Sequence, residues 1–321
     1  MRARGCLINA AIVAGTLALC FGALEIGLRL FGSEHGDWYG AGPQRAAFRR
    51  NHVDLNSAGF RDAEFPATRT PGRTRILAVG DSFTFGAGIE DPADTWPKVL
   101  EARLRESGWD VEVLNFGRAG TNTAFQRHLL NEQGWTLSPD RIVLAFVPND
   151  PEPPGSNTAV VPVRLNPPLL PLPGLDLALS RTSWSYAWIR ARKNRVLERL
   201  GSKETYDEYV RSLYEPGPDW NAFQEAASGL VTDATRRGVP VTVALFPLIH
   251  DLESNPWDAQ LARAAEVFRE AGAEVVDLRE AFRGHATAEL RLSPTDAHPN
   301  ELGQRLAAEA VARQLAPELE R

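Results

Sequence analysis

The sequence predicts an α/β protein built on a parallel β-sheet, preceded by an N-terminal membrane helix. From about residue 75 onward, short apolar runs typical of buried strands alternate with longer amphipathic stretches typical of helices. Strands separated by helices of this length indicate a parallel sheet with right-handed crossovers. The membrane helix is indicated by an apolar run at residues 7–24, which approaches the length needed to span a bilayer.

Composition narrows the classes of function. The 321 residues are enough for one large core, and 43% hydrophobic with 24% charged residues is typical of a globular protein. A formal net charge of −6 disfavours a nucleic-acid partner, because phosphate binding requires a basic surface. Both cysteines, Cys6 and Cys20, lie near the N-terminus, so the body of the protein has no disulfide and no thiol nucleophile.

The N-terminal segment is expected to anchor the protein. Arg2 and Arg4 precede the apolar run, and basic residues at this place predict that the N-terminus stays in the cytoplasm. A cleaved signal peptide is the alternative, but no convincing small-x-small cleavage site follows the run. We therefore expect residues 1–31 to be an uncleaved signal anchor that holds an extracytoplasmic domain, periplasmic or at the cell surface.

A polar juxtamembrane segment, residues 32–74, follows the anchor. Its scattered Gly, Pro, Arg and Asp residues are typical of a tether. Within it, turn-forming residues at 56–59 precede Phe60 and Arg61. Arg61 is either an anion contact in a substrate site or part of a structural salt bridge, and the second role is the more common one.

The main domain is expected to span residues 75–321. Its strands are predicted at residues 76–79, 111–116, 141–147, 240–246 and 274–278. Its helices are predicted at residues 94–106, 121–133, 220–237, 257–271 and 300–315.

A proline-rich insertion at residues 151–219 interrupts this alternation, with one helical piece at 183–200. So long an insertion directly after a strand is typical of a lid or a recognition element. Trp184, Tyr186 and Trp188 either stack on sugar rings or pack the insertion onto the body, and packing is the more usual role.

A sharp junction between strand and turn lies at residues 80–88. The first apolar strand stops at Gly80, and Ser82 follows where a helix can begin. The carboxyl ends of parallel strands form the edge where open α/β sheets bind ligands. Ser82 is therefore placed to present its hydroxyl to a substrate. The alternative is that it only caps a helix.

Three further blocks follow this junction in a fixed order: Asn-Phe-Gly-Arg-Ala-Gly at 115–120, Pro-Asn-Asp at 148–150 and Asp-Ala-His-Pro-Asn at 296–300. With Gly-Asp-Ser at 80–82 they resemble the four blocks of the SGNH (GDSL-type) hydrolases, of the membrane-anchored bacterial envelope type. The resemblance covers roughly residues 75–316. It implies a three-layer, flavodoxin-like SGNH fold with a parallel sheet, and a serine esterase.

The resemblance also implies a catalytic triad. Ser82 would be the nucleophile and His298, in the loop before the last helix, the base that takes its proton. Asp296 would fix the tautomer of His298 and stabilise the imidazolium. Many members of the family carry the aspartate three residues ahead of the histidine, where this chain has Thr295. This departure puts the geometry of Asp296 in question more than its identity.

By the same resemblance, the oxyanion hole consists of the Ser82 N–H, the Gly120 N–H and the Asn149 side chain. Gly117 lies in the same loop, but the spacing of the family selects Gly120. Pro148 stands in the part of the third block that the family usually opens with glycine, so a stiffer loop is expected there. The alternative role for Asn149 is only to shape a turn.

Other ligand types are not indicated. His250 is the rival base, since it follows the strand at 240–246, and with Arg61 it is a candidate substrate contact. The sequence has no cluster of histidines and carboxylates with metal-ligand spacing and no Walker-type phosphate loop. We therefore expect neither a metal nor a cofactor.

The sequence is best interpreted as a membrane-anchored serine esterase that cleaves O-acyl esters, such as acetyl groups, of an envelope or extracellular carbohydrate or lipid. Its expected partners are a small ester or acylated glycan and the membrane, with no nucleic acid. An O-acyltransferase with the same triad is an alternative that the sequence does not separate from it. A non-catalytic binding or scaffold protein is a third, which Ser82, Asp296 and His298 disfavour.

Overall fold

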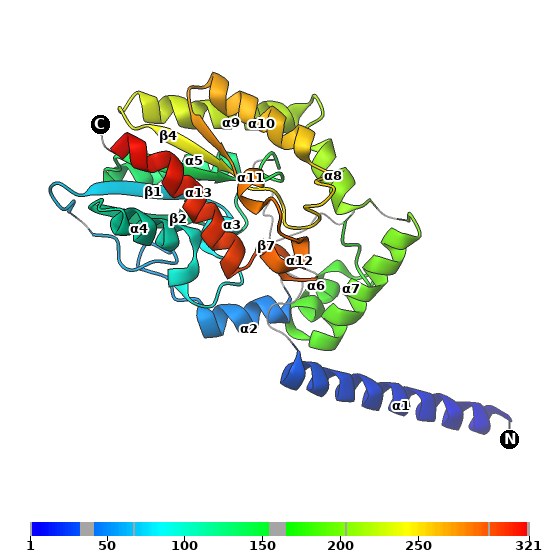
Figure 1. Ribbon diagram of the computed structural model, residues 1–321. Helices are drawn as coiled ribbons and strands as arrows, with labels where there is room; N and C mark the ends of the chain where they lie inside the picture. Colours follow the sequence, from blue (N-terminus) through cyan, green and yellow to red (C-terminus); the bar gives the residue numbers. More distant parts are fainter. Residues whose placement is uncertain are drawn as a thin grey trace. The chain divides into compact units, whose positions relative to one another are not determined.

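The computed structural model of the chain describes residues 2–32, 42–66, 68–153, 165–202, 204–294 and 296–319. Its contacts divide the chain into two compact units. One comprises residues 1–50 and 161–204, and the other comprises residues 51–160 and 205–321. The larger, second unit contains the whole of the parallel sheet (Figure 1).

The sheet has five parallel strands in the order β2-β1-β3-β4-β5. They are β1 (Thr74–Gly80), β2 (Val111–Gly117), β3 (Arg141–Phe146), β4 (Val241–Leu245) and β5 (Glu274–Asp277). All residues of β2, β3 and β4 are buried, as expected for strands covered on both faces. The parallel α/β sheet predicted from the sequence is confirmed.

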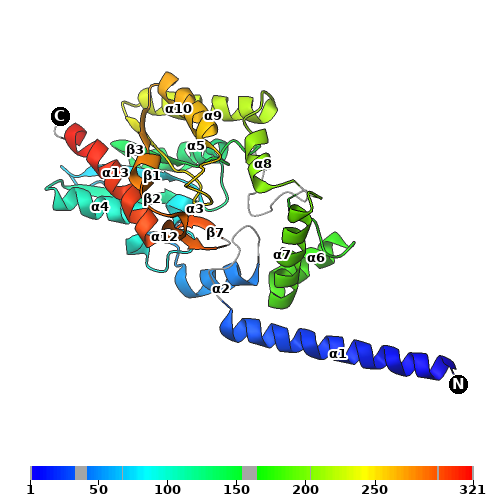
Figure 2. The same cartoon turned by 45° about the vertical axis from the view of Figure 1, so that its right-hand side comes forward.

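Helices cover both faces of the sheet. On one face α4 (Trp96–Glu106) packs against α13 (Glu301–Leu319). On the other, α9 (Pro218–Thr235) packs against both α5 (Thr123–Glu132) and α10 (Asp258–Glu270). Figures 1 and 2 show the two groups of helices on opposite sides of the strands, which is the three-layer arrangement expected.

Aromatic side chains fill the core on the side of α9 and α10. The rings of Phe146 on β3, Phe223 on α9 and Phe268 on α10 lie 5.5 to 5.9 Å apart, centroid to centroid. Each is almost completely buried. Rings at this spacing add to the free energy of burying their apolar surface, so this cluster fixes both helices on the sheet.

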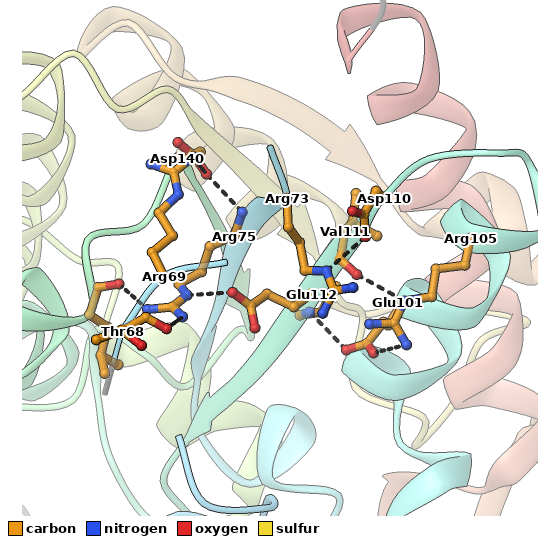
Figure 3. Close-up of polar contacts among 12 residues, drawn as sticks. Thr68, Arg69, Arg73, Arg75, Glu101, Arg105, Asp110, Val111, Glu112 and Asp140 are labelled. Carbon is orange, nitrogen blue, oxygen red and sulfur yellow. Dashed lines mark hydrogen bonds and ion pairs between the residues drawn. The ribbon is translucent and has the colours of Figure 1, made fainter. Parts of the chain in front are cut away.

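The amino ends of β1 and β2 carry a polar network (Figure 3). Arg75 on β1 is buried, and its Nε donates to Glu112 on β2 over 2.7 Å. Its guanidinium also donates to the carbonyls of Leu137 and Thr68, and its backbone N–H donates to the carboxylate of Asp140. An ion pair this deeply buried is costly to break, because either partner alone is an uncompensated charge. It therefore fixes the amino ends of β1 and β2 against each other.

The carboxyl ends of the strands form the opposite edge. The chain runs from β1 to β2 on one side and then crosses back to β3 on the other side of β1. Open α/β sheets bind ligands where the strand order reverses in this way. Ser82, Gly120 and Asn149 follow β1, β2 and β3 at this edge.

Short elements complete this unit. They are α3 (Ser82–Phe85), η1 (Pro92–Asp94), η2 (Gly134–Leu137), α8 (Tyr206–Ser212), α11 (Arg279–Phe282), α12 (Thr287–Leu290), β6 (Arg291–Ser293) and β7 (Asp296–Pro299). The last two pair antiparallel as a separate two-stranded ribbon.

The smaller unit consists of helices. It contains α1 (Arg2–Phe31), α6 (Pro173–Thr182), α7 (Trp184–Arg199) and most of α2 (Pro43–His52). Within α1, Ile8–Phe31 is long and apolar enough to cross a membrane, and none of it is buried. The middle of the predicted insertion, residues 165–204, thus groups with the N-terminal helix. Residues 154–164 of the insertion lie outside the described residues.

Candidate active site

Ser82 is the first residue of the one-turn helix α3, and only Asp81 separates it from the end of β1. Asp81 caps this helix, because its Oδ1 accepts a hydrogen bond from the Phe83 N–H over 2.8 Å. Gln304 on α13 supports the same turn by donating to the Phe83 carbonyl and accepting from the Trp96 N–H. The serine that the sequence singled out therefore begins a helix, and its hydroxyl stands at the carboxyl edge of the sheet.

Gly117, at the end of β2, allows α3 to lie close to the sheet. A Cβ at this position would come within 2.4 Å of the Phe85 backbone nitrogen and 2.6 Å of the Thr84 carbonyl carbon. Both atoms belong to the backbone and cannot turn aside as a side chain would. Gly117 thus has a packing role beneath the serine helix, which is different from the role expected of Gly120.

His298 lies on β7, where a loop was expected. Strand β7 pairs with β6, and the Ala297 carbonyl also accepts from the Ile249 N–H over 3.1 Å. The His298 ring lies 5.2 Å from the Phe83 ring, centroid to centroid. The histidine is therefore held by backbone pairing on two sides and by contact with the serine helix itself.

The three residues of the predicted triad form a continuous hydrogen-bonded chain. His298 Nε2 lies 2.8 Å from Ser82 Oγ, and His298 Nδ1 lies 2.6 Å from Asp296 Oδ1. The same carboxylate oxygen accepts from the His298 backbone N–H over 3.0 Å. The side chain of Asp296 is fully buried and that of His298 is 14% exposed. The Asp-x-His spacing thus brings the carboxylate to the histidine.

This arrangement determines what the imidazole can do. Nδ1 faces a carboxylate oxygen that only accepts, so Nδ1 carries the proton and Nε2 presents a lone pair to the serine. A neutral imidazole in this tautomer can take a proton from Ser82 Oγ, and the buried carboxylate stabilises the imidazolium that forms. The geometry is that of an activated serine nucleophile.

Two further buried carboxyl groups belong to this edge of the sheet: Asp81 contacts Ser82, and Asp150 is near enough to Asp81 to sense its charge. Asp81 Oδ2 is a second acceptor for the serine hydroxyl at 3.3 Å, and Asp150 accepts from the Val147 N–H and from the Gln126 amide. Burial raises the pKa of Asp81, and burial together with the charge of Asp81 raises the pKa of Asp150 well above its usual range. The carboxylate paired with His298 is a third group, distinct from these two.

The candidate oxyanion donors follow the neighbouring strands. Gly120 has a φ of 79°, a left-handed conformation that glycine adopts without strain, and Asn149 lies in the turn after β3. Both residues are half-buried. Within the described part of the chain, neither the Gly120 N–H nor the Asn149 amide donates a hydrogen bond. Both donors are therefore available to an oxygen of a ligand.

Arg61 has neither of the two expected roles, since it is neither a substrate contact at the serine edge nor part of a salt bridge among the described residues. Its side chain is fully buried, and its guanidinium donates to the backbone carbonyls of His52, Gly86, Ile89 and Glu90. Among the described residues no carboxylate lies within ion-pair distance of it. Burial lowers its pKa to about 10. Arg61 therefore ties the loop after the serine helix to the segment that precedes β1.

His250 is not part of the hydrogen-bonded chain in the structure. Its side chain is exposed in a turn after β4, and its ring lies 6.0 Å from the Trp257 ring, centroid to centroid. The neighbouring Asp251 is engaged with Ser254. A role for His250 in substrate binding remains a prediction.

The sequence analysis did not find the supporting residues of the site. Asp81 and Asp150 both lie inside the recognised blocks, and a carboxylate one residue before a nucleophile is a signal that could have been used. Gln304 lies in the first turn of α13, 222 positions away from Ser82 in the chain, and nothing in its local sequence marks it. Its function depends on tertiary packing alone.

A family model matches this constellation. The model of the GDSL-like Lipase/Acylhydrolase family matches residues 78–306, which is most of the chain and includes all four blocks. Among curated proteins, no match to the chain was found.

Several solved structures are similar to the chain. A lipolytic protein of the G-D-S-L family from Desulfitobacterium hafniense is 16% identical with a TM-score of 0.45, over 75% of this chain and 98% of its own. A two-domain esterase active on acetylated mannans is 15% identical with a TM-score of 0.47, over 78% of this chain and 50% of its own. An acetylxylan esterase from Geobacillus stearothermophilus is 14% identical with a TM-score of 0.46, over 75% and 94%. By the match to the family model, the chain belongs to the GDSL-like lipase/acylhydrolase family and is a serine esterase.

Proposed function

We propose that the protein is a membrane-anchored esterase that hydrolyses O-acyl esters of an extracytoplasmic carbohydrate or lipid, with Ser82, His298 and Asp296 as its catalytic triad. One observation carries the proposal. Two short hydrogen bonds, of 2.8 and 2.6 Å, connect the serine hydroxyl through the imidazole to a buried carboxylate.

The reaction begins at Ser82. Its Oγ attacks the carbonyl carbon of the ester while its proton passes to His298 Nε2, and the carbonyl oxygen becomes an oxyanion. The Ser82 and Gly120 N–H groups and the Asn149 amide donate to this oxyanion, each donor contributing roughly 3–4 kcal/mol to the stability of the transition state. Asp296 stabilises the imidazolium through Nδ1–H.

Collapse of the intermediate breaks the bond between the carbonyl carbon and the alcohol oxygen. His298 returns its proton to that oxygen, and the alcohol leaves an acyl group on Ser82. Water then attacks the carbonyl carbon of the acyl-enzyme and gives its proton to His298. The bond between this carbon and Ser82 Oγ breaks, His298 returns the proton to Oγ, and the acid is released. If the hydroxyl of a sugar replaces water in this step, the same residues transfer the acyl group, so hydrolysis and transfer differ only in the acceptor.

The proposed site in the cell follows from α1. Its apolar Ile8–Phe31 segment is long enough to span a bilayer, and basic residues precede it. We place the catalytic unit on the extracytoplasmic side. Extraction of membranes with alkaline carbonate tests the anchor: the protein should stay with the membranes, and its release would contradict the proposal.

An assay on p-nitrophenyl esters of increasing acyl length tests the chemistry. The acetylated glycans named for two of the similar structures make acetylated xylan and mannan oligosaccharides the next substrates to try. The masses of the products distinguish hydrolysis, which releases free acid, from transfer, which moves the acyl group to an added glycan. We expect free acid from the wild type and from the surface control Ser107→Ala, and none from Ser82→Ala. Undiminished turnover by Ser82→Ala would refute the assignment of the nucleophile.

A further inference from the structure

The start of helix α7, in the insertion, is capped by a carboxylate of the N-terminal helix α1. Glu25 on α1 accepts hydrogen bonds from the Ser183 hydroxyl and the Ser185 N–H, both over 2.8 Å, and from the Trp184 N–H over 3.2 Å. The first N–H groups of a helix have no partner within the helix and favour a negative charge. The anchor thus supplies an N-terminal cap for an element 158 residues further along the chain.

A second contact joins the anchor to the end of α6. Arg29 pairs with Glu25 over 2.7 Å and donates to the carbonyl of Thr182, the last residue of α6, over 3.0 Å. At Gly32 a Cβ would lie 2.8 Å from the Trp184 ring, so the chain passes directly over that side chain. The C-terminal end of α1 is therefore fixed to the junction between α6 and α7. Both charged residues are in the last two turns of the apolar segment, where a spanning helix reaches the headgroups.

The outer surface around α6 is apolar. Between residues 166 and 180 every exposed residue is apolar. Leu172 is 61% exposed and Leu175 is 47% exposed. The charged residue of this segment, Asp176, is buried, where it accepts from the Tyr186 hydroxyl and pairs with Arg190. Contiguous exposed leucines of this kind are uncommon on proteins surrounded by water.

The outer surface of α7 is basic as well as apolar. Trp188, Arg192 and Val196 follow at spacings of four and form one stripe, with the Arg192 guanidinium 4.5 Å from the centroid of the Trp188 ring. Residues 181–200 contain six basic side chains and one acidic one, in a chain whose formal net charge is −6. Arg190 pairs with Asp176, and Lys193 donates to the carbonyls of Pro167 and Pro168. The other four are exposed: Arg181, Arg192, Arg195 and Arg199. Tryptophan beside arginine at the edge of an apolar surface is typical of the interface between a bilayer and water.

We propose that α6 and α7 lie on the surface of the same bilayer that α1 crosses, with the α6 leucines at the acyl boundary and the basic side chains of α7 against anionic headgroups. The proposal rests on the membrane anchor, since α1 brings this surface to the lipid. The hydrogen bonds of Glu25 and Arg29 make the surface continuous with the end of the spanning segment. An apolar face bordered by lysine and arginine is the pattern that binds anionic membranes. On this account residues 165–200 hold the protein on the membrane instead of acting as a lid.

Spin labels on the full-length protein in phosphatidylglycerol nanodiscs test the proposal. Cys6 and Cys20 are replaced by serine, and single cysteines are placed at Leu175 in the proposed surface, Leu17 in α1 and Glu225 on the exposed face of α9. Collision rates with oxygen, which concentrates in lipid, and with a water-soluble nickel chelate give the surroundings of each label. Turnover of a soluble ester by each variant shows that it is folded.

We expect the label at position 175 to resemble the label at 17 and to differ from the water-exposed label at 225. A label at 175 that resembles the one at 225, while 17 is in lipid, would overturn the proposal. Shielding of 175 from both reagents would also overturn it, because another protein surface would then cover α6. A label at 17 that is in water would refute the anchor itself, and ester turnover reports on the esterase separately.

A label at Val196 tests the charge recognition by α7. It should lie deeper in phosphatidylglycerol nanodiscs than in phosphatidylcholine nanodiscs, because only the first lipid presents a negative headgroup. Equal depths in the two lipids would overturn the assignment of α7 to anionic headgroups.

Discussion

Replacing Asp296 by asparagine tests the part of the site where this chain departs from its family. Asp296 Oδ1 accepts from both the Nδ1 and the backbone N–H of His298, and among the described residues its buried Oδ2 has no hydrogen-bond partner. The amide of asparagine fits this place in two ways. With its oxygen toward His298, both contacts remain but the charge is lost. With its NH₂ toward His298, a donor faces the backbone N–H and favours the tautomer in which Nε2 cannot accept from Ser82.

The structure allows an estimate of how much folding stability and kcat Asp296→Asn loses. In the first orientation, the hydrogen bonds lose their charge assistance and the NH₂ group is buried without an acceptor, which costs about 1–3 kcal/mol of folding stability. In the second, the base is in the wrong tautomer, and a loss of about 10⁴-fold in kcat is expected for such a triad. At 1.36 kcal/mol per tenfold, that is about 5.4 kcal/mol of transition-state stabilisation. We expect a fall in kcat of about 10³- to 10⁴-fold with little change in KM.

Steady-state kinetics on a p-nitrophenyl ester, with the thermal midpoint measured on the same samples, checks this prediction. Asp91→Asn is the matched control, because Asp91 caps η1 through the Ala93 N–H and asparagine caps a helix equally well. Asp91→Asn should leave kcat and the midpoint unchanged. If Asp296→Asn lowers the midpoint but keeps near-normal kcat at low temperature, then Asp296 only braces β7 and the triad role is wrong.

Three more predictions concern the supports of the site. Arg75→Met leaves Glu112 buried without its partner, so the free energy of unfolding in urea should fall by about 3–5 kcal/mol while kcat is unchanged; an altered kcat would contradict the separation of the two sheet edges. The raised pKa of Asp150 means that the folded protein keeps a proton that the unfolded chain releases above about pH 3.9. Its contribution to stability is therefore lost as the pH rises, and urea midpoints should favour Asp150→Asn over the wild type increasingly as the pH is raised above about 4; a constant difference would contradict the raised pKa. Deletion of residues 1–31 should leave kcat near that of the wild type but remove the Glu25 cap, so that limited proteolysis cuts α7 faster; loss of all activity would show that the domain boundary is wrong.

The sheet was predictable because most of its strands are short, mainly apolar runs, and β2, β3 and β4 are buried along their whole length. This pattern does not depend on distant residues. The strand expected at 141–147 is β3 (Arg141–Phe146), and the one expected at 111–116 is β2 (Val111–Gly117). Helix starts were less accurate for a local reason. The helix expected from residue 94 begins at Trp96, because Pro92–Asp94 forms a separate 3₁₀ turn that Asp91 caps.

Other parts depend on contacts that the local sequence does not encode. The ribbon of β6 and β7 has strands of only three and four residues, too short to show a period, so His298 was expected in a loop. Helix α6 begins at Pro173-Gly174, a pair that usually marks a turn. Arg61 was expected to meet an anion, but the carbonyls that bind it come from residues 52 and 86–90 and meet only in the folded chain.

The most direct test of the account is to label the native protein with a fluorophosphonate, which reacts only with an activated serine, and to locate the adduct by peptide mass spectrometry. The 2.8 Å contact between His298 Nε2 and Ser82 Oγ predicts one adduct per chain, on Ser82, that is lost in His298→Ala although the serine remains. Labelling of another serine, or labelling of Ser82 that is unaffected by His298→Ala, would contradict the account.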